Sequence, residues 1–159
     1  MNKILDILAN NARASFEDIG RQTGFKASEV KKAIEGWEKD STILGYKAVL
    51  HPDHLKGSGV VALIEVSITP QKDVGFDHVA ERIYQFSEVK TCYLVSGGYD
   101  LLVVVEGENI QTVANFVASK LSPMENVRQT TTHFLLKKYK EDGQIFNKTN
   151  KPKRLNISY

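Results

Sequence analysis

One stretch near the middle of the chain, residues 89–106, limits the fold more than any other. Two apolar segments rich in β-branched residues, 89–95 and 101–105, flank the short break Ser-Gly-Gly-Tyr-Asp at residues 96–100. This pattern is typical of a β-hairpin, with glycine supplying backbone angles that other residues resist. Both arms are apolar at odd and even positions. We therefore expect helices of the chain to cover one face of the hairpin, and a second subunit or a ligand to cover the other.

Composition indicates a globular protein with one ordinary domain or two small ones. The 159 residues are 42% hydrophobic and 25% charged, which is typical of folded rather than disordered chains. A net charge of +2 is too small to indicate nucleic-acid binding, so such binding would need a local basic surface. The single cysteine, Cys92, excludes an intrachain disulfide and a cysteine zinc site. With no secretory leader and no long apolar span, we expect a cytoplasmic protein that does not enter membranes.

The first fifty residues predict a small helical DNA-binding domain, 1–50. Apolar residues recur at helical spacing in three segments between residues 3 and 40, and Ser15 with Asp18 predicts a capping box at the start of the second helix. Gly24 breaks the chain before the third helix, which gives the spacing of a helix-turn-helix. Residues 43–50 alternate and predict a strand that forms a wing. The residues expected to face inward are Ile4, Leu5, Leu8, Phe16, Ile19, Val30, Ala33, Ile34 and Trp37.

The third helix carries the candidate DNA-binding residues. Lys26, Ser28, Lys31 and Lys32 lie at or near its start, where a recognition helix meets bases and phosphates. Acidic residues on the same helix would repel phosphate if they faced it. Residues 1–50 contain eight basic and seven acidic residues, a net of +1, so charge leaves a second interpretation open, a plain helical oligomerisation module.

The rest of the chain predicts an α+β domain, 60–142, after a linker at 51–59 that is polar and rich in proline and glycine. A strand at 60–69, a helix at 76–83, the hairpin, a helix at 110–121 and a strand at 127–136 follow in that order. This is the βαββαβ order of the ferredoxin-like sandwich, in which helices cover one face of an antiparallel sheet. The open face would be apolar here, so we expect at least a homodimer.

The carboxy-terminal extension, 143–159, is basic. It carries a net charge of +4 with no acidic residue. Such a tail is either solvated, or adds a strand to a sheet edge through residues 155–159, which alternate weakly.

Motifs for catalysis are absent from the sequence. It contains no glycine-rich phosphate loop, no HExxH and no G-x-S-x-G, so we expect no enzyme, cofactor or metal. His51 and His54 lie three residues apart beside a proline, and we expect them to be solvated rather than to bind a metal. His133 is expected on the last strand, facing the helices or an interface. Cys92 is interpreted as a buried strand residue.

Taken together, these features resemble the Lrp/AsnC family of bacterial and archaeal transcription regulators over roughly residues 3–140. The order and spacing of several positions carry the resemblance. These are Ile4-Leu5, Asn11-Ala12-Arg13, Val30, Ile34, Glu38, Ile43, Gly45-Tyr46, Val89, Gly97, Asp100, Thr130 and Thr132.

The resemblance implies a regulator that binds double-stranded DNA through a winged helix-turn-helix and senses a small metabolite, plausibly an amino acid. Its ferredoxin-like domain, of the RAM or ACT-like type, would form homodimers that assemble further, commonly into octamers. The implied effector-binding residues are Gly97, Gly98, Tyr99 and Asp100, with Thr130 and Thr132. Backbone N–H groups at a glycine turn can bind a carboxylate, and Asp100 could receive an ammonium. The alternative is that the glycines serve only turn geometry and Asp100 only a turn hydrogen bond.

Several positions depart from the family pattern. Lys26 stands where Ser is common, Ala33 where Arg is typical, Trp37 where Leu is usual and Ser41 where Gly is. Loss of an arginine contact to a base costs about 1–3 kcal/mol. This keeps open a metabolite-binding oligomer with weakened DNA binding. A further alternative is an enzyme similar to sirohaem decarboxylases, for which His133 with Arg128 is the only suggestion.

Overall fold

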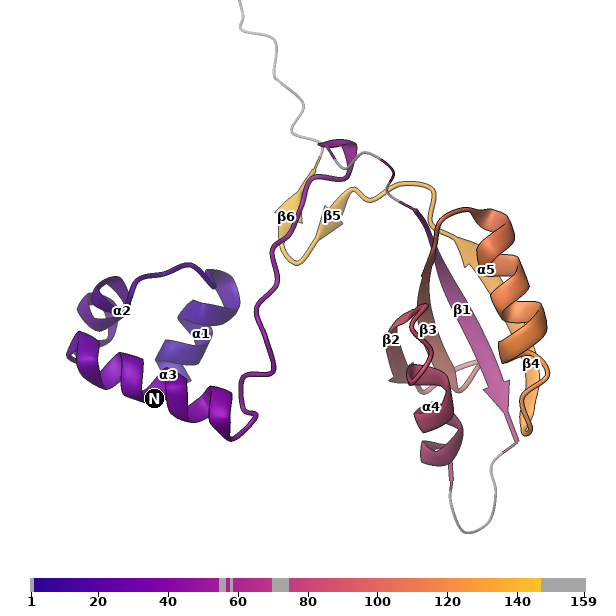
Figure 1. Cartoon of the computed structure of the whole chain (residues 1–159), viewed down its shortest axis with the longest axis horizontal. Coiled ribbons are helices and arrows are strands. Elements are labelled where there is room, and N and C mark those ends of the chain that lie inside the picture. The colour runs from indigo at the N-terminus through magenta and orange to yellow at the C-terminus, as the bar shows by residue number, and fades with distance from the viewer. Residues whose placement is uncertain (1, 55–56, 58, 70–74, 147–159) are drawn as a thin grey trace, which may run out of the picture. The chain divides into compact units, whose positions relative to one another are not determined.

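The computed structural model describes residues 2–54, 57, 59–69 and 75–146, and the chain divides into two compact units (Figure 1). Unit 1 is Met1–Leu50 and unit 2 is His51–Tyr159. Each unit has its own cluster of buried apolar side chains.

Unit 1 consists of three helices around a small core. They are α1 (Asn2–Asn10), α2 (Phe16–Thr23) and α3 (Ala27–Lys39). Helical spacing predicted these helices and most of their inward residues, because one apolar stripe per helix must be buried. Phe16 is an exception and is 37% exposed. The buried residues are Ile4, Leu8, Ile19, Val30 and Ile34, with Trp37 and Ile43 packed against them.

The strand predicted at residues 43–50 is wrong. The segment forms no strand, because a strand needs a hydrogen-bonded neighbour and the described part of unit 1 otherwise contains only helices and turns. Its start is held instead by α3. The Ile43 N–H donates to the Trp37 carbonyl at 2.9 Å, and the Tyr46 hydroxyl donates to the Glu38 carboxylate at 2.8 Å. Leu44 remains 91% exposed.

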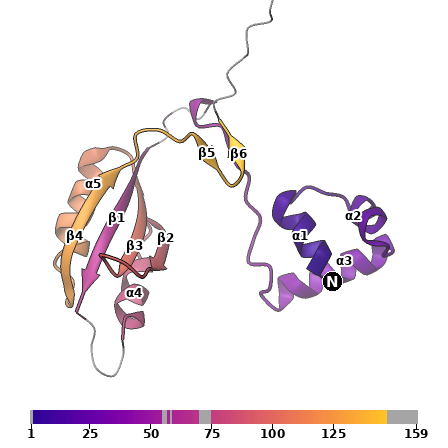
Figure 2. The ribbon, with the colours of Figure 1, turned by 180° about the vertical axis from the view of Figure 1, so that it is seen from behind.

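Unit 2 has the predicted βαββαβ order. Its elements are β1 (Val60–Ile68), α4 (Asp77–Tyr84), β2 (Val89–Leu94), β3 (Leu101–Gly107), α5 (Ile110–Phe116), the π-helical turn η2 (Val117–Leu121) and β4 (Val127–Phe134). The four strands form one antiparallel sheet in the order β2-β3-β1-β4. Both helices lie on the same side of this sheet (Figures 1 and 2).

The two faces of the sheet differ in burial. On the helix side, β1 and β3 contribute fully buried residues, among them Ile64, Val66 and Val103, which pack with Val79 and Ile83 of α4. On the other face Val61, Leu63, Leu102 and Val104 are only half-buried and Tyr93 is 57% exposed. The prediction of an apolar open face is therefore confirmed for the single chain.

The second predicted helix, 110–121, is interrupted. After α5 the backbone widens into η2, where the Ser122 N–H donates to the carbonyl of Val117, five residues earlier, at 2.8 Å. Within α5 itself, Val113 and Phe116 are buried, whereas Ile110 and Ala114 are exposed. A local change of helical period such as η2 is not revealed by apolar spacing alone.

The first residues of the predicted carboxy-terminal extension form part of a short hairpin. Strands β5 (Lys140–Glu141) and β6 (Gln144–Ile145) pair as a short hairpin, so residues 143–146 belong to it. Asp142 and Gly143 form its turn with φ angles of 45° and 80°. The strand predicted at 155–159 lies outside the described residues.

His51 is not a solvated side chain as predicted. Its Nε2 lies 3.0 Å from the Phe146 carbonyl oxygen, and its ring meets the Phe146 ring edge-on at 5.6 Å. His54, in the 3-10 turn η1 (Pro52–His54), is exposed as expected. No sequence signal links the linker to the hairpin, because 95 residues separate these two partners.

Candidate functional site

The amino-terminal half of α3 presents a basic surface. Val30 and Ile34 are buried and fix one side of the helix against α1 and α2. Lys26, Ser28, Lys31 and Lys32 are all exposed. The four candidate DNA-binding residues are thus accessible to an anionic partner.

Two acidic residues of α3 that lie close to the candidate lysines, Glu29 and Glu35, have local partners. A carboxylate oxygen of Glu29 accepts the Lys26 backbone N–H at 2.8 Å, which completes one half of a capping box. Glu35 lies 3.7 Å from the Lys31 ammonium in an exposed i,i+4 pair, and such pairs contribute only about 0.3–0.5 kcal/mol. Lys32 has no acidic partner among the described residues. Lys26 and Lys32 are therefore the two candidate cations that form no ion pair in the described part of the chain.

Two glycines set the connection from α2 to α3. Gly24 ends α2 in the left-handed region, with φ at 82°, where glycine is strongly preferred. Gly20 lies inside α2, and a Cβ built there would sit 2.6 Å from the Phe25 carbonyl oxygen. The close approach of the turn to α2 therefore depends on glycine at position 20. Sequence reasoning missed Gly20, although a glycine inside a helical pattern signals close packing.

The connection between β2 and β3 does not need glycine for the unusual backbone angles that the sequence predicted. Neither Gly97 nor Gly98 has a positive φ, and a Cβ built on either would meet nothing within 4 Å. Both residues are exposed, and their N–H groups have no hydrogen-bond acceptor in the described part of the chain. Turn geometry therefore does not explain the glycines, and two amides remain available to a ligand.

Asp100 anchors this connection to the neighbouring strand. Its Oδ2 accepts the Ile68 N–H at 2.8 Å, and its own N–H donates to the Val66 carbonyl at 3.1 Å. Its carbonyl accepts the Val95 N–H at 2.9 Å. One carboxylate oxygen thus has a structural role, as the turn-hydrogen-bond alternative expects. Tyr99, beside it, is half-buried.

Thr130 and Thr132 lie on β4, paired with Val66 and Ile64 of β1. Directly paired residues share a face of an antiparallel sheet, so both threonines point to the helix side. Thr130 Oγ1 lies 3.0 Å from Ser122 Oγ. Asp100 and Thr130 flank the same end of β1, whereas Thr132 lies two residues farther along. The structure therefore brings Thr130, but not Thr132, to the strand end that Asp100 contacts.

The remaining candidates offer no catalytic arrangement. His133 Nε2 lies 3.2 Å from Glu65 Oε1 on the open face of the sheet. Burial raises the pKa of the Cys92 thiol, which makes it a poorer nucleophile. Within the described ranges, no three His, Cys, Asp or Glu side chains gather as a metal would require. No helix in the described part of the chain is long and apolar enough to span a membrane.

Comparison with known proteins identifies the family. Residues 61–145 match the model of the Lrp/AsnC ligand binding domain. An HTH-type transcriptional regulator of Bacillus subtilis (strain 168), YugG, is 47% identical over 157 residues, which cover 98% of this chain and 95% of that protein. The chain belongs to the Lrp/AsnC family.

A further sequence relative and two solved structures extend the comparison. HTH-type transcriptional regulator LrpA of Pyrococcus horikoshii is 28% identical, covering 86% of this chain and 94% of its own. The crystal structure of the Neisseria meningitidis regulator NMB0573 with L-Met is 25% identical at a TM-score of 0.68, covering 87% of this chain and 89% of that one. The leucine response regulatory protein of Mycobacterium tuberculosis has the same fold, with a TM-score of 0.71. It is 21% identical, and the match covers 91% of this chain and 96% of that one. The two sequence relatives are named as regulators, so the enzyme alternative gains no support.

Proposed function

We propose that this Lrp/AsnC transcription regulator binds double-stranded DNA through α3 and responds to a small metabolite through unit 2. The proposal rests on how α3 is presented. Val30 and Ile34 fix its buried side, and its exposed residues include Lys31 and Lys32, with Lys26 at the N-cap. In this proposal α2, the Gly24 turn and α3 act as a helix-turn-helix. We expect the protein to act where DNA is, in the cytoplasm.

Lys26, Lys31 and Lys32 are proposed to contact phosphates, with Ser28 as a further polar contact. Each phosphate that is neutralised adds about 0.9 to the slope of log K against log salt concentration, so DNA binding should be strongly salt-dependent. Paired subunits would place their α3 helices in successive major grooves, and the operator would then be a palindrome with half-sites about one helical turn apart.

The proposed effector site is the β2–β3 connection at residues 96–100. The free N–H groups of Gly97 and Gly98 can bind the carboxylate of an amino acid, and the unbonded oxygen of Asp100 can accept from its ammonium. Tyr99 and Thr130 would line this site, whereas Thr132 is a weaker candidate because it lies farther along β4. A relative's structure contains L-Met, which supports an amino-acid effector.

The open face of the sheet is the proposed homodimer interface. Val61, Leu63, Leu102 and Val104 are half-buried there, and burying apolar area contributes about 25 cal/mol per Å². We expect dimers that assemble further, for example into octamers, and sedimentation velocity measures this. Leu63→Lys should give a monomer, because it would bury an unpaired charge at the centre of that face. An unchanged sedimentation coefficient would exclude this face as the interface.

Selection from genomic DNA tests the DNA-binding proposal. The protein is incubated at physiological salt with fragmented DNA of its source organism, and the retained fragments are sequenced. A few upstream regions that share a palindrome should be enriched, and Lys32→Gln should lower affinity for all of them. Lys90→Gln, an exposed lysine of β2, is the matched control. Uniform or absent enrichment from folded oligomer would overturn the proposal.

The second candidate function is a metabolite-binding oligomer with weakened DNA binding. The Lys31–Glu35 pair favours it, since that carboxylate would lie close to an approaching phosphate, and Ala33 supplies no basic contact. Failed enrichment together with amino-acid binding by the same preparation would support this candidate.

A further inference from the structure

A groove on the helix side of unit 2 shares no residue with the β2–β3 connection. Its volume is about 640 Å³, within the range of about 300–1,000 Å³ typical of small-molecule sites. Arg82, Gln85 and Phe86 line it from the carboxy-terminal end of α4. Ser119, Lys120 and Met124 line it from η2 and the turn after it.

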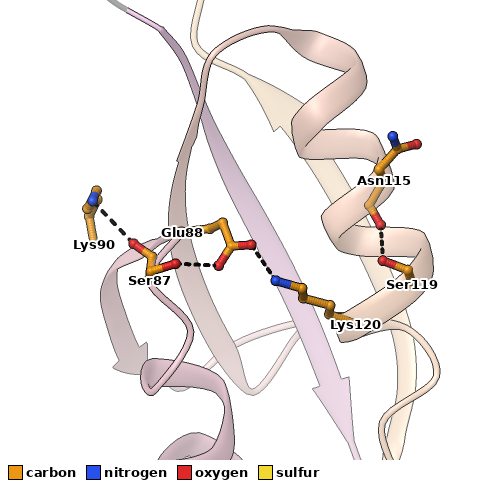
Figure 3. A network of polar contacts seen from close by, with 6 residues as sticks. All are labelled: Ser87, Glu88, Lys90, Asn115, Ser119 and Lys120. Carbon is orange, nitrogen blue, oxygen red and sulfur yellow. Dashed lines mark hydrogen bonds and ion pairs between the residues drawn. The ribbon is translucent and has the colours of Figure 1, made fainter.

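The groove has two cationic walls. The Lys120 ammonium lies 2.5 Å from Glu88 Oε1 (Figure 3). It also lies 5.4 Å from the centre of the Phe86 ring. An ammonium has three donors, so Glu88 leaves two of them available. Arg82 is exposed and has no carboxylate partner among the described residues. Two cations therefore face the groove, and one carboxylate beside it is already bound to Lys120.

The backbone around Lys120 is unusual in the same place. Ser119 and Lys120 lie within the π-helical turn η2, a less favourable hydrogen-bonding arrangement that proteins often retain at functional sites. Figure 3 shows Lys120 projecting from this turn toward Glu88. The floor of the groove is apolar, because Phe86 is half-buried and Met124 is only 8% exposed.

We propose that this groove binds a small apolar carboxylate that has no amino group. The carboxylate would bind the Arg82 guanidinium and a free donor of Lys120, and the apolar body would pack on Phe86 and Met124. An amino acid is disfavoured, because its ammonium would meet two cations and a carboxylate that is already bound. The site thus differs in ligand class from the β2–β3 connection, and it does not depend on DNA binding.

Methionine methyl NMR on the full chain tests the proposal. The sequence contains two methionines, Met1 and Met124, so a carbon-13 methyl label places one reporter in the groove floor. Titration with 3-phenylpropionate should shift the Met124 signal saturably, with a dissociation constant of about 1 mM. 3-Phenylpropionamide, which has no charge, and L-phenylalanine, which adds the ammonium, should bind at least about tenfold more weakly.

Variants assign the effect to the groove. Arg82→Gln should raise the dissociation constant for 3-phenylpropionate about tenfold or more, because a charge-assisted contact is lost. Arg128→Gln, which changes an exposed arginine on β4, should leave it unchanged. Absence of a Met124 shift up to about 10 mM probe would overturn the proposal. Equal responses to the three compounds, or equal behaviour of the two arginine variants, would also overturn it.

Discussion

The two glycine-containing connections of this molecule look alike in sequence but differ in what the backbone requires. Between α2 and α3, Gly24 has a φ of 82° and Gly20 faces the Phe25 carbonyl too closely to accept a Cβ. Between β2 and β3, Gly97 and Gly98 have ordinary backbone angles and open space around them. The first pair therefore serves the fold. The second pair leaves two backbone amides accessible, and the fold of the single chain does not require glycine at either position.

Substitution inside α2 should give the largest effect on stability. Gly20→Ala places a methyl group 2.6 Å from the Phe25 carbonyl oxygen, and relieving such a backbone clash should cost at least about 2 kcal/mol. Urea unfolding followed by the fluorescence of Trp37, the single tryptophan, which lies in unit 1, measures the loss. Gly36→Ala in α3 meets open space and should raise stability by up to about 1 kcal/mol. Equal effects of the two variants would show that the close approach is unimportant.

A smaller effect is expected at the start of α2. Ser15 Oγ accepts the Asp18 N–H at 3.0 Å, and the same hydroxyl donates to the Asp18 carboxylate at 2.7 Å. Ser15→Ala should therefore lower the stability of unit 1 by about 1 kcal/mol at neutral pH, measured by the same unfolding curve. Ser28→Ala on α3 is the control.

The Ser15 substitution should also change the pH dependence of stability. The hydrogen bond from Ser15, and then the one from Arg21, holds the pKa of Asp18 below its usual 3.8. Because the folded-state pKa is depressed, this stabilisation is present above the unfolded pKa and is lost as pH falls through the folded one. Ser15→Ala should make the loss of stability below about pH 3.8 less steep. An unchanged acid limb would contradict this role.

The smallest effect on stability is expected in the β2–β3 connection. Gly98→Val should leave the thermal midpoint of unit 2 unchanged or raise stability by up to about 1 kcal/mol, because it restricts the unfolded chain without a clash in the folded one. Differential scanning calorimetry measures this. A clear loss of stability would mean that the glycine serves the fold after all and would remove the contrast with Gly20.

Periodicity predicted most of the fold, because buried stripes and alternating strands are local patterns. It identified α1 to α3, β1, α4 and β4 within a few residues. It failed at residues 43–50, where alternation predicted a strand but the described part of unit 1 has no neighbouring strand to pair with it. The hairpin β5–β6 was missed although its Asp142–Gly143 dipeptide is a known hairpin signal.

The candidate sites were less predictable, because they depend on contacts distant in sequence. Helical spacing predicted α3, and the structure exposes Lys26, Lys31 and Lys32 at or near its start. The Asp100–Ile68 hydrogen bond, the His51–Phe146 contact and the groove around Lys120 join residues that no local pattern connects. Gly97 and Gly98 have no positive φ, which contradicts the simple hairpin-turn interpretation, and residue types alone do not fix these angles.

Effector-dependent DNA binding by the wild type and Gly98→Val tests the central claim most directly. Fluorescence anisotropy on a selected DNA fragment, repeated with each of the twenty amino acids, would measure affinity for both proteins. We predict that at least one amino acid changes the affinity of the wild type, and that Gly98→Val binds the DNA equally well without effector but no longer responds. A variant that responds as the wild type does would contradict the claim that these exposed amides form the effector site.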